Sequence, residues 1–373
     1  MSLPPLVGHG DLRRRLAEAA DAGRLPQSLL FHGPEGVGKQ RLALWLGRRL
    51  LCGRGGCGEC RSCRLADRLE HPDLHWFFPL SRPTGTSSRE KLREKLEEAR
   101  MEALEERRSE PLAVRDPDGA TGIYLAAVEE MRAKAVRRPA MGRSSVFVVG
   151  DAEAMVPQAA SQQAANAFLK LLEEPPDDTW VILTSSRRGA LLPTVRSRVL
   201  SMRVAPLDRE QVASFLVEEA GAEPPAAEAA ARRSQGSIGR ALRELSDEEE
   251  GHRERAEAFL EAALSREPAD RWELAARISP SGARGGFSDT LAAVSELLRD
   301  LAAVALQQGE RSFQPERARR LARDRRLTVH GLSRALDRVE EARAEAAGNV
   351  NPQALTATLL HDMARAFSEG AAG

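Results

Sequence analysis

Residues 28–40 read Ser28-Leu-Leu-Phe-His-Gly33-Pro-Glu-Gly36-Val-Gly38-Lys39-Gln40, and this stretch decides the fold class. Its apolar start predicts a buried strand, and the residues that follow predict a helix from Lys39 to Leu51. A glycine-rich loop between a strand and a helix is the setting of a phosphate-binding loop, because its N–H groups and the helix N-terminus attract an anion. The candidate phosphate-binding residues are Gly33, Gly36, Gly38 and Lys39.

Apolar runs and helical patterns alternate along the chain as far as about residue 206. The further predicted strands are Val146–Val149, Trp180–Leu183 and Val199–Val204, and the further predicted helices are Asp11–Ala22 and Ala159–Glu173. Short buried strands separated by helices are typical of a parallel sheet that is covered on both faces. We therefore predict an α/β domain with a parallel sheet over residues 1–206.

Beyond residue 206 the patterns are helical only. Residues 207–250 predict a small domain of three short helices, and residues 251–373 predict an all-α domain whose last helix begins at Asn351-Pro352. Residues 87–108 are highly charged, and they lie in a stretch of about 81–120 that interrupts the α/β pattern. Since a run of charged residues is usually exposed to solvent, we expect a solvated helical insertion there.

Composition excludes several classes of protein. Lysine plus arginine and aspartate plus glutamate each number 55 among the 373 residues, so the net charge is zero and predicts only weak nonspecific binding to nucleic acid. No apolar run approaches the ~20 residues that cross a bilayer. The N-terminal residues lack the basic and apolar regions of a signal peptide. We expect a cytoplasmic protein with no membrane partner.

All four cysteines lie between Cys52 and Cys63. The other two are Cys57 and Cys60, so the last three follow a Cys-x2-Cys-x2-Cys pattern. Thiols packed this closely are typical of a tetrahedral Zn²⁺ site, whereas a disulfide framework spreads its cysteines along the chain. We predict a closed, structural zinc site made by all four. Four unliganded thiols in a flexible loop are the alternative.

The residues that hold magnesium in a phosphate-loop ATPase are missing or altered. An ATPase places a serine or threonine hydroxyl after the loop lysine, and this chain has Gln40 there. An acid is expected after the strand Val146–Val149, where Gly150 and Asp151 follow. In one alignment Gly150 replaces the metal-binding acid and Asp151 the water-activating one. In the other, Asp151 keeps the metal position and an alanine replaces the base. Either alignment impairs hydrolysis.

Together these motifs resemble the AAA+ clamp-loader subunits of bacterial DNA polymerase III, which include gamma/tau, and within that family the delta-prime type. The resemblance covers most of the first 240 residues. The matching strings are Leu29–Lys39, Cys57–Cys63, His71–Asp73, Val148–Glu153, Ala164–Pro176 and Leu192–Arg198. The most specific is Asn166-Ala-Phe-Leu-Lys-Leu-Leu-Glu-Glu-Pro-Pro176.

The resemblance implies an AAA+ domain, a helical lid (207–250) and a collar (251–373) that joins a ring of five subunits. It implies gamma/tau and delta subunits as partners, together with a sliding clamp and primed DNA, in a replisome at the nucleoid. Arg198 stands at the position of an arginine finger that acts on a neighbour's ATP, although Val199 replaces the family's next cysteine. Thr184 stands at the sensor of the γ-phosphate.

The second sensor arginine is absent by this comparison. An active loader ATPase reads Gly-Ser-x-Arg, whereas this chain reads Gly236-Ser-Ile-Gly239, with Arg240 one place late. The resemblance therefore implies a subunit that binds ATP or ADP weakly or not at all and does not hydrolyse ATP by itself, yet completes another subunit's site. The alternatives are an ATP-hydrolysing gamma/tau-type motor and an unrelated zinc-stabilised nucleotide-binding regulator.

Overall fold

The computed structural model describes residues 2–85, 88–115, 121–142, 144–155, 162–279, 286–308, 312, 314–323, 325, 327–346 and 350–371. Residues 159–161, the predicted start of one helix, lie outside this part of the chain, as do residues 86–87 and 116–120 of the charged insertion. The chain divides into two compact units, Met1–Leu245 and Ser246–Gly373. The division into three domains stays a prediction.

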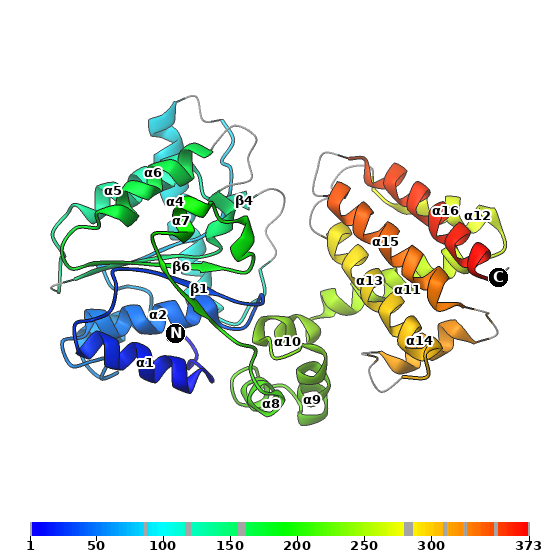
Figure 1. Cartoon of the computed structure of the whole chain (residues 1–373), viewed down its shortest axis with the longest axis horizontal. Coiled ribbons are helices and arrows are strands. Elements are labelled where there is room, and N and C mark those ends of the chain that lie inside the picture. Colours follow the sequence, from blue (N-terminus) through cyan, green and yellow to red (C-terminus); the bar gives the residue numbers. More distant parts are fainter. Residues whose placement is uncertain are drawn as a thin grey trace. The chain divides into compact units, whose positions relative to one another are not determined.

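The first unit is built on a parallel sheet of five strands, counted over the described residues (Figure 1). Its strands are β1 (Ser28–His32), β2 (Leu74–Phe77), β5 (Ser145–Val149), β6 (Thr179–Ser185) and β7 (Leu200–Arg203). They are ordered β2-β5-β6-β1-β7. Phe31 pairs with Thr184 on one side and with Met202 on the other, so β1 lies inside the sheet between β6 and β7. The predicted α/β fold class is confirmed, and of these five strands the edge strand β2 is the one that was not predicted from the sequence.

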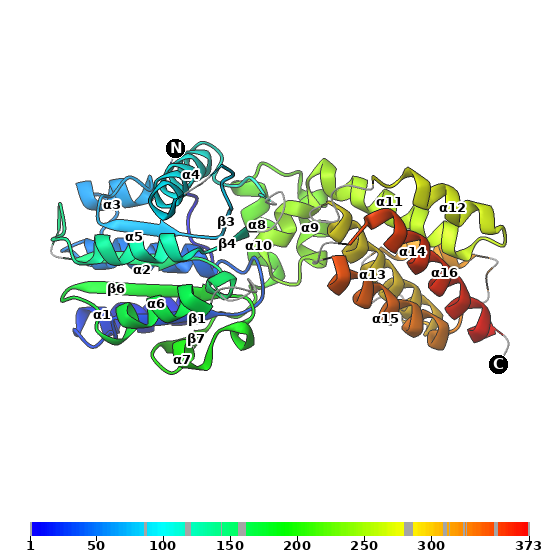
Figure 2. The same cartoon turned by 90° about the horizontal axis from the view of Figure 1, so that it is seen from above.

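Helices cover both faces of the sheet, with α1 and α2 on one side and α5 and α6 on the other (Figures 1 and 2). The helices of this unit before residue 206 are α1 (Gly10–Asp21), α2 (Lys39–Leu51), α3 (Arg61–Asp67), α4 (Arg89–Ser109), α5 (Leu125–Ala135), η1 (Ala152–Met155), α6 (Gln162–Glu173), η2 (Arg188–Ala190) and α7 (Pro193–Arg196). Two cores result from the alternation of side chains along each strand. Leu29 and Phe31 face α1 and α2, while Leu30 faces the opposite core.

The charged insertion is packed more closely than its composition suggests. It consists of β3 (Leu80–Ser81), α4 and β4 (Thr121–Gly122), and the two strands pair antiparallel. Leu96 and Leu104 on α4 are buried, and so is Arg100, whose guanidinium lies 4.8 Å from the ring centre of Phe77. Arginine can bury its stem and stack on aromatic rings, so a charged helix can still have a packed face.

Three short helices follow β7 and enclose a small core of their own. They are α8 (Arg209–Glu218), α9 (Pro224–Arg233) and α10 (Ile238–Glu244). Val212 and Phe215 lie in this core, and the N-terminal Val7 and the insertion's Leu112 pack against it. Segments from three parts of the chain therefore meet beside the phosphate loop.

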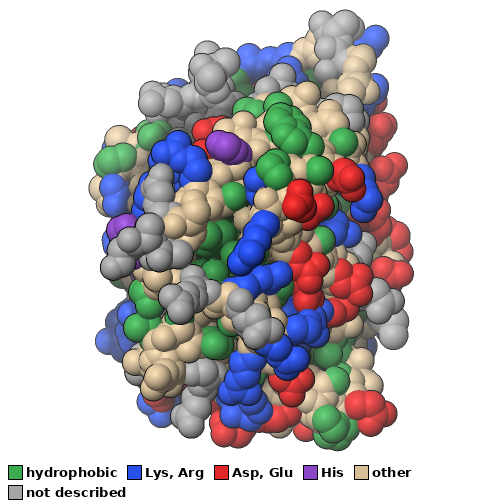
Figure 3. Space-filling model, turned by 90° about the vertical axis from the view of Figure 1, so that its right-hand side faces the viewer, with side chains coloured by type: hydrophobic (Ala, Val, Ile, Leu, Met, Phe, Trp, Pro, Cys, Tyr) green, Lys and Arg blue, Asp and Glu red, His purple; other side chains and the backbone are tan. Residues whose placement is uncertain are grey.

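The second unit is wholly helical over its described residues, as the sequence predicted. Its helices are α11 (Asp247–Leu264), α12 (Pro268–Arg277), α13 (Gly286–Ala305), α14 (Pro315–Ala322), α15 (Val329–Ala346) and α16 (Pro352–Ala371). The apolar stripe of α13 forms the centre of a single core. Figure 3 shows that acidic, basic and hydrophobic side chains all occur on the face that it displays, so both signs of charge are present on this face. None of the described helices is long and apolar enough to cross a membrane.

Candidate functional site

The phosphate loop joins β1 to α2, and its glycines are required by close approaches. Gly36 has a φ of 72°, and a Cβ there would lie 2.2 Å from Ser237 Oγ. A Cβ on Gly33 would lie 2.1 Å from the carbonyl oxygen of Val204. Neither position has room for a side chain, so the loop keeps the compact shape that leaves its N–H groups available for an anion.

Lys39 lies inside this loop. Its Nζ donates to the carbonyl oxygen of Pro34 at 2.6 Å and to Ser186 Oγ at 2.8 Å. Burial lowers the pKa of the Lys39 ammonium, while the nearby carboxylates of Asp151, Glu153 and Glu35 raise it. The ammonium is therefore held where a phosphate could replace the carbonyl and hydroxyl oxygens as its partner.

Gln40 is the first residue after the loop lysine, and its amide is engaged at both ends. Its Nε2 donates to Asp151 Oδ2 at 2.9 Å, and its Oε1 accepts from Trp76 Nε1 at 3.1 Å. A Cβ on Gly150 would lie 2.7 Å from Gln40 Oε1. The amide therefore lies where a side chain at position 150 would begin, and the Asp151 carboxylate is bonded to the amide in either of the two alignments.

Asp151 is a largely buried carboxylate that lies beside other acidic side chains. Burial raises the pKa of its carboxyl group, and the negative charge of Glu153 raises it further, to about 6. Its backbone N–H donates to Thr184 Oγ1 at 3.1 Å, and Thr184 is fully buried at the end of β6. The structure thus brings Thr184 and Asp151 together beside Gln40.

Glu153 is a buried carboxylate to which the sequence reasoning gave no role. Its Oε1 accepts the backbone N–H groups of Ser186 at 2.9 Å and Arg187 at 3.1 Å. These bonds hold the turn after β6 and so place the Ser186 hydroxyl against Lys39. The only sequence signal was an acid four residues after the end of β5.

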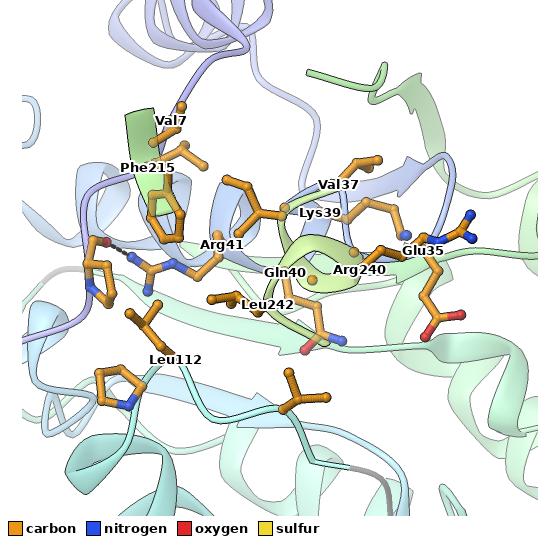
Figure 4. A pocket seen from close by; sticks show the side chains of 18 of the residues that line it. Val7, Glu35, Val37, Lys39, Gln40, Arg41, Leu112, Phe215, Arg240 and Leu242 are labelled. Carbon is orange, nitrogen blue, oxygen red and sulfur yellow. Dashed lines mark hydrogen bonds between the residues drawn. The ribbon is translucent and has the colours of Figure 1, made fainter. Parts of the chain in front are cut away.

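A cavity of about 370 Å³ opens beside the loop (Figure 4). Its walls are the N-terminal segment, the phosphate loop, the end of the insertion and the helices α8 and α10, represented by Val7, Lys39, Leu112, Phe215 and Leu242. Arg41 enters it and donates to the carbonyl oxygen of Pro4. Burial lowers the pKa of Arg41 to about 10. The volume and the apolar walls fit a small ligand such as a nucleotide.

The first residues of α10 pack against the phosphate loop. Gly239 donates its N–H to the carbonyl oxygen of Gly36 at 3.1 Å, and a Cβ on Gly239 would lie 3.0 Å from the Gly36 Cα. A Cβ at position 239 would therefore press against the loop backbone. The next residue, Arg240, lines the cavity instead (Figure 4).

Arg198 lies at an exposed corner, away from the buried residues of the loop. It follows α7, and its side chain is 34% exposed. Its Nη1 donates to the carbonyl oxygen of Thr194 at 2.9 Å, and its Nε donates to Glu173 Oε1 at 2.6 Å. The guanidinium is thus within reach of another molecule.

The four cysteines converge between α2 and α3. Their sulfur atoms all lie within 4.8 Å of one another, and Cys52 Sγ is 3.8 Å from that of Cys57 and 3.7 Å from that of Cys60. Four sulfurs bound at 2.3 Å to a tetrahedral ion are about 3.8 Å apart, whereas a disulfide bond is about 2.05 Å long. The spacing therefore fits a shared metal ion.

The surroundings of the thiols also fit a cation. Burial opposes ionisation of Cys52, but N–H groups of Cys57, Arg54 and Gly56 outweigh it and lower the pKa of Cys52 to about 6. Burial raises the pKa of Cys63. A thiolate at Cys63 needs a compensating positive charge, which a divalent ion bound by all four sulfurs would supply.

The cysteine cluster is tied to the sheet by polar contacts. Ser62 Oγ donates to the carbonyl oxygen of Leu51 at 3.0 Å and lies 2.9 Å from His71 Nε2. His71 Nδ1 accepts the N–H of Asp73 at 3.1 Å. The Asp73 carboxylate in turn accepts three N–H groups at residues 140–142, just before β5. These hydrogen bonds therefore connect the cysteine cluster to the residues that precede β5.

Comparison with known proteins gives one family match and several similar relatives. The sequence profile of the family described as "DNA polymerase III, delta subunit" matches residues 8–208. The chain is similar to DNA polymerase III subunit delta' of Escherichia coli (strain K12), at 31% identity over 61% of this chain and 57% of the relative. It is 29% identical to subunit delta' of Yersinia pestis, over 80% of this chain and 76% of the relative. It is also 30% identical to subunit gamma/tau of Mycobacterium tuberculosis (strain ATCC 25618 / H37Rv), over 53% of this chain and 27% of that protein.

The matches to the first curated relatives are partial in length. The chain spans 57% of the Escherichia coli delta' subunit and 50% of the Bacillus subtilis (strain 168) delta' subunit. The family match begins just before α1 and ends just after β7, so it includes the phosphate loop, the cysteine cluster and Arg198.

Proposed function

The chain belongs to the family of the DNA polymerase III delta subunit, and from this membership we propose that it is a delta-prime-like subunit of the polymerase's clamp loader. In this role it helps to load the sliding clamp onto primed DNA in the cytoplasm. Its partners are the gamma/tau and delta subunits, the clamp, and DNA reached through the assembled complex. The subunit supplies an arginine to a neighbour's ATP site and does not hydrolyse ATP efficiently by itself.

The observation that carries this proposal is the double engagement of Gln40. In a working ATPase a hydroxyl and a carboxylate hold Mg²⁺, which neutralises charge in the transition state. Here an amide bonded to Trp76 and Asp151 fills that place, and Gly150 offers no carboxylate. The proposed nucleotide site keeps Lys39, with Thr184 at its side, and can hold a nucleotide weakly while lacking the means to cleave it.

Arg198 is the proposed arginine finger. A finger must reach out of its own subunit, because the charge that it stabilises develops on a phosphate bound by the neighbour. The exposure of the Ser197-Arg198 corner supports this role, since a guanidinium enclosed in its own domain could not act in trans.

The cysteine cluster is the proposed zinc site, with Cys52, Cys57, Cys60 and Cys63 as its four ligands. All four positions of a tetrahedral ion would be taken by sulfur, which leaves none for water or substrate. The zinc would therefore stabilise the loop between α2 and α3 and take no part in ATP chemistry.

The second candidate is a gamma/tau-type motor, which the similarity to gamma/tau subunits favours. The two candidates differ in which chain hydrolyses ATP. A motor needs a metal-binding hydroxyl and acid in its own phosphate site, and the contacts of Gln40 support the non-hydrolysing role instead.

Reconstitution tests the proposed role. A complex is assembled from the gamma/tau and delta subunits of the same organism with and without this chain, and the clamp is labelled with a fluorophore. We expect clamp loading onto primed DNA only when this chain is present. Loading at an equal rate without it would contradict the proposal, and an unrelated AAA+ protein at equal concentration serves as the control.

A further inference from the structure

Arg198 is held in place by a carboxylate from another helix. Its Nε and Nη2 both contact Glu173 Oε1, at 2.6 Å and 2.5 Å. Its Nη1 donates to the carbonyl oxygen of Thr194 at 2.9 Å and to Ser197 Oγ at 3.3 Å. Contacts on both sides of the guanidinium therefore fix its orientation.

Glu173 has a well-defined backbone position because its helix, α6, is packed into the core. It is the last residue of α6, on which Phe168, Leu171 and Leu172 are buried in the core of the sheet domain. Glu174 donates its N–H to the carbonyl oxygen of Lys170, and Pro175 prevents the helix from continuing. The Glu173 carboxylate thus starts from a fixed backbone position.

The corner that carries Arg198 is equally well defined. Helix α7 begins with Pro193 at its first position, and Val195 is buried against α6 and the sheet. The N–H of Arg198 donates to the carbonyl oxygen of Val195 at 3.1 Å. Both residues of the Glu173–Arg198 pair are therefore carried by backbone segments that are packed against the core.

We propose that Glu173 is the positioning residue of Arg198, whose guanidinium it holds in one orientation at the domain surface, ready to meet the neighbouring subunit's nucleotide. This inference rests on the proposed function of Arg198 as a finger. The side chains of the pair are 34% and 42% exposed, and an exposed ion pair is weak. Phosphate oxygens of a bound ATP can therefore compete for the guanidinium, which reaches them without first having to be ordered.

The test uses the complete complex with its ATP-hydrolysing subunits and measures single-turnover phosphate release at several ATP concentrations. The variants are Glu173→Ala, Glu173→Gln and Arg198→Ala, with Glu174→Ala as the control because Glu174 is the exposed neighbour. Ordering one long side chain corresponds to about a three- to tenfold effect. We expect Glu173→Ala to lower the maximal rate by that factor without changing the ATP concentration needed for half of it.

Two further results distinguish positioning from a general structural role. Glu173→Gln keeps an oxygen that accepts an N–H, so it should recover part of the rate. Adding Glu173→Ala to Arg198→Ala should cause no further loss, because the residue that it positions is already gone. An additive loss, or no recovery with glutamine, would overturn the inference.

The outcomes separate this inference from the function on which it rests. If Arg198→Ala leaves phosphate release unchanged, the proposed finger is wrong, and the role of Glu173 falls with it. If Arg198→Ala is impaired and Glu173→Ala is not, only the role of Glu173 is wrong. A faster rate with Glu173→Ala would mean that Glu173 restrains Arg198, which also overturns the inference. Equal thermal unfolding midpoints of all variants confirm that the fold is kept.

Discussion

Replacing Arg198 with alanine is expected to slow ATP hydrolysis at the neighbouring site of the complex by about 10³-fold or more. An arginine supplied in trans neutralises charge that develops on the transferred phosphoryl group, and such residues contribute roughly 10³–10⁵ in rate. The chain's own stability should hardly change, because an exposed ion pair such as that with Glu173 contributes little. Single-turnover phosphate release by the reconstituted complex measures the effect.

A matched control is available within the same unit. Arg209 forms an ion pair with Glu228, and its side chain is 47% exposed. Arg209→Ala removes an exposed arginine and a pair of similar type, so it reports any general effect of lost charge. Arg198→Lys should stay impaired, because an ammonium lacks the guanidinium's paired donors. Equal rates for Arg198→Ala and Arg209→Ala would reject the finger.

Loss of the proposed zinc ion is expected to unfold the loop and the short helix α3 between α2 and β2. In Cys63→Ser the zinc content should fall from one per chain to nearly zero, because one buried ligand is lost. Structural zinc contributes about 10–16 kcal/mol to the folding of small zinc peptides. Residues 52–68 should then lose protection from hydrogen exchange, while the central strands keep theirs. Metal analysis and hydrogen exchange with mass spectrometry measure both changes.

The control for this prediction is Arg61→Ala, an exposed position on the same short helix α3. It should keep one zinc per chain and normal protection. Treatment of the unaltered protein with a strong chelator should reproduce the behaviour of Cys63→Ser. A metal-free protein whose residues 52–68 are as protected as those of the untreated protein would disprove the zinc site.

Sequence patterns predicted the centre of the sheet because apolar runs are strong signals. Val146–Val149 and Trp180–Leu183 lie in buried strands, and both were predicted. The edge strand β2 was missed because His75 and neighbouring polar residues interrupt its apolar pattern. Helix α4 was predicted, but its packing was not, since the burial of Arg100 depends on an aromatic ring supplied by β2.

The candidate site could be predicted in its residue types but not in its contacts. The sequence indicated that Gln40 and Gly150 are unsuited to magnesium. It could not indicate that the Gln40 amide fills the space beside Gly150, because this depends on how β5 and α2 pack. The pairs Trp76–Gln40 and Glu173–Arg198 join residues that are 36 and 25 positions apart. No local pattern reports such pairs, since they arise only when the elements are assembled.

ATP hydrolysis by the purified chain alone, with Mg²⁺ and primed DNA present, tests the proposed non-hydrolysing role of this subunit. The loop that would bind phosphate is intact, whereas an amide occupies the position of the metal-binding hydroxyl. We expect phosphate release no faster than in a protein-free control, while the complex containing the same preparation is active. Turnover by the isolated chain at a rate comparable to that of the complex would contradict it.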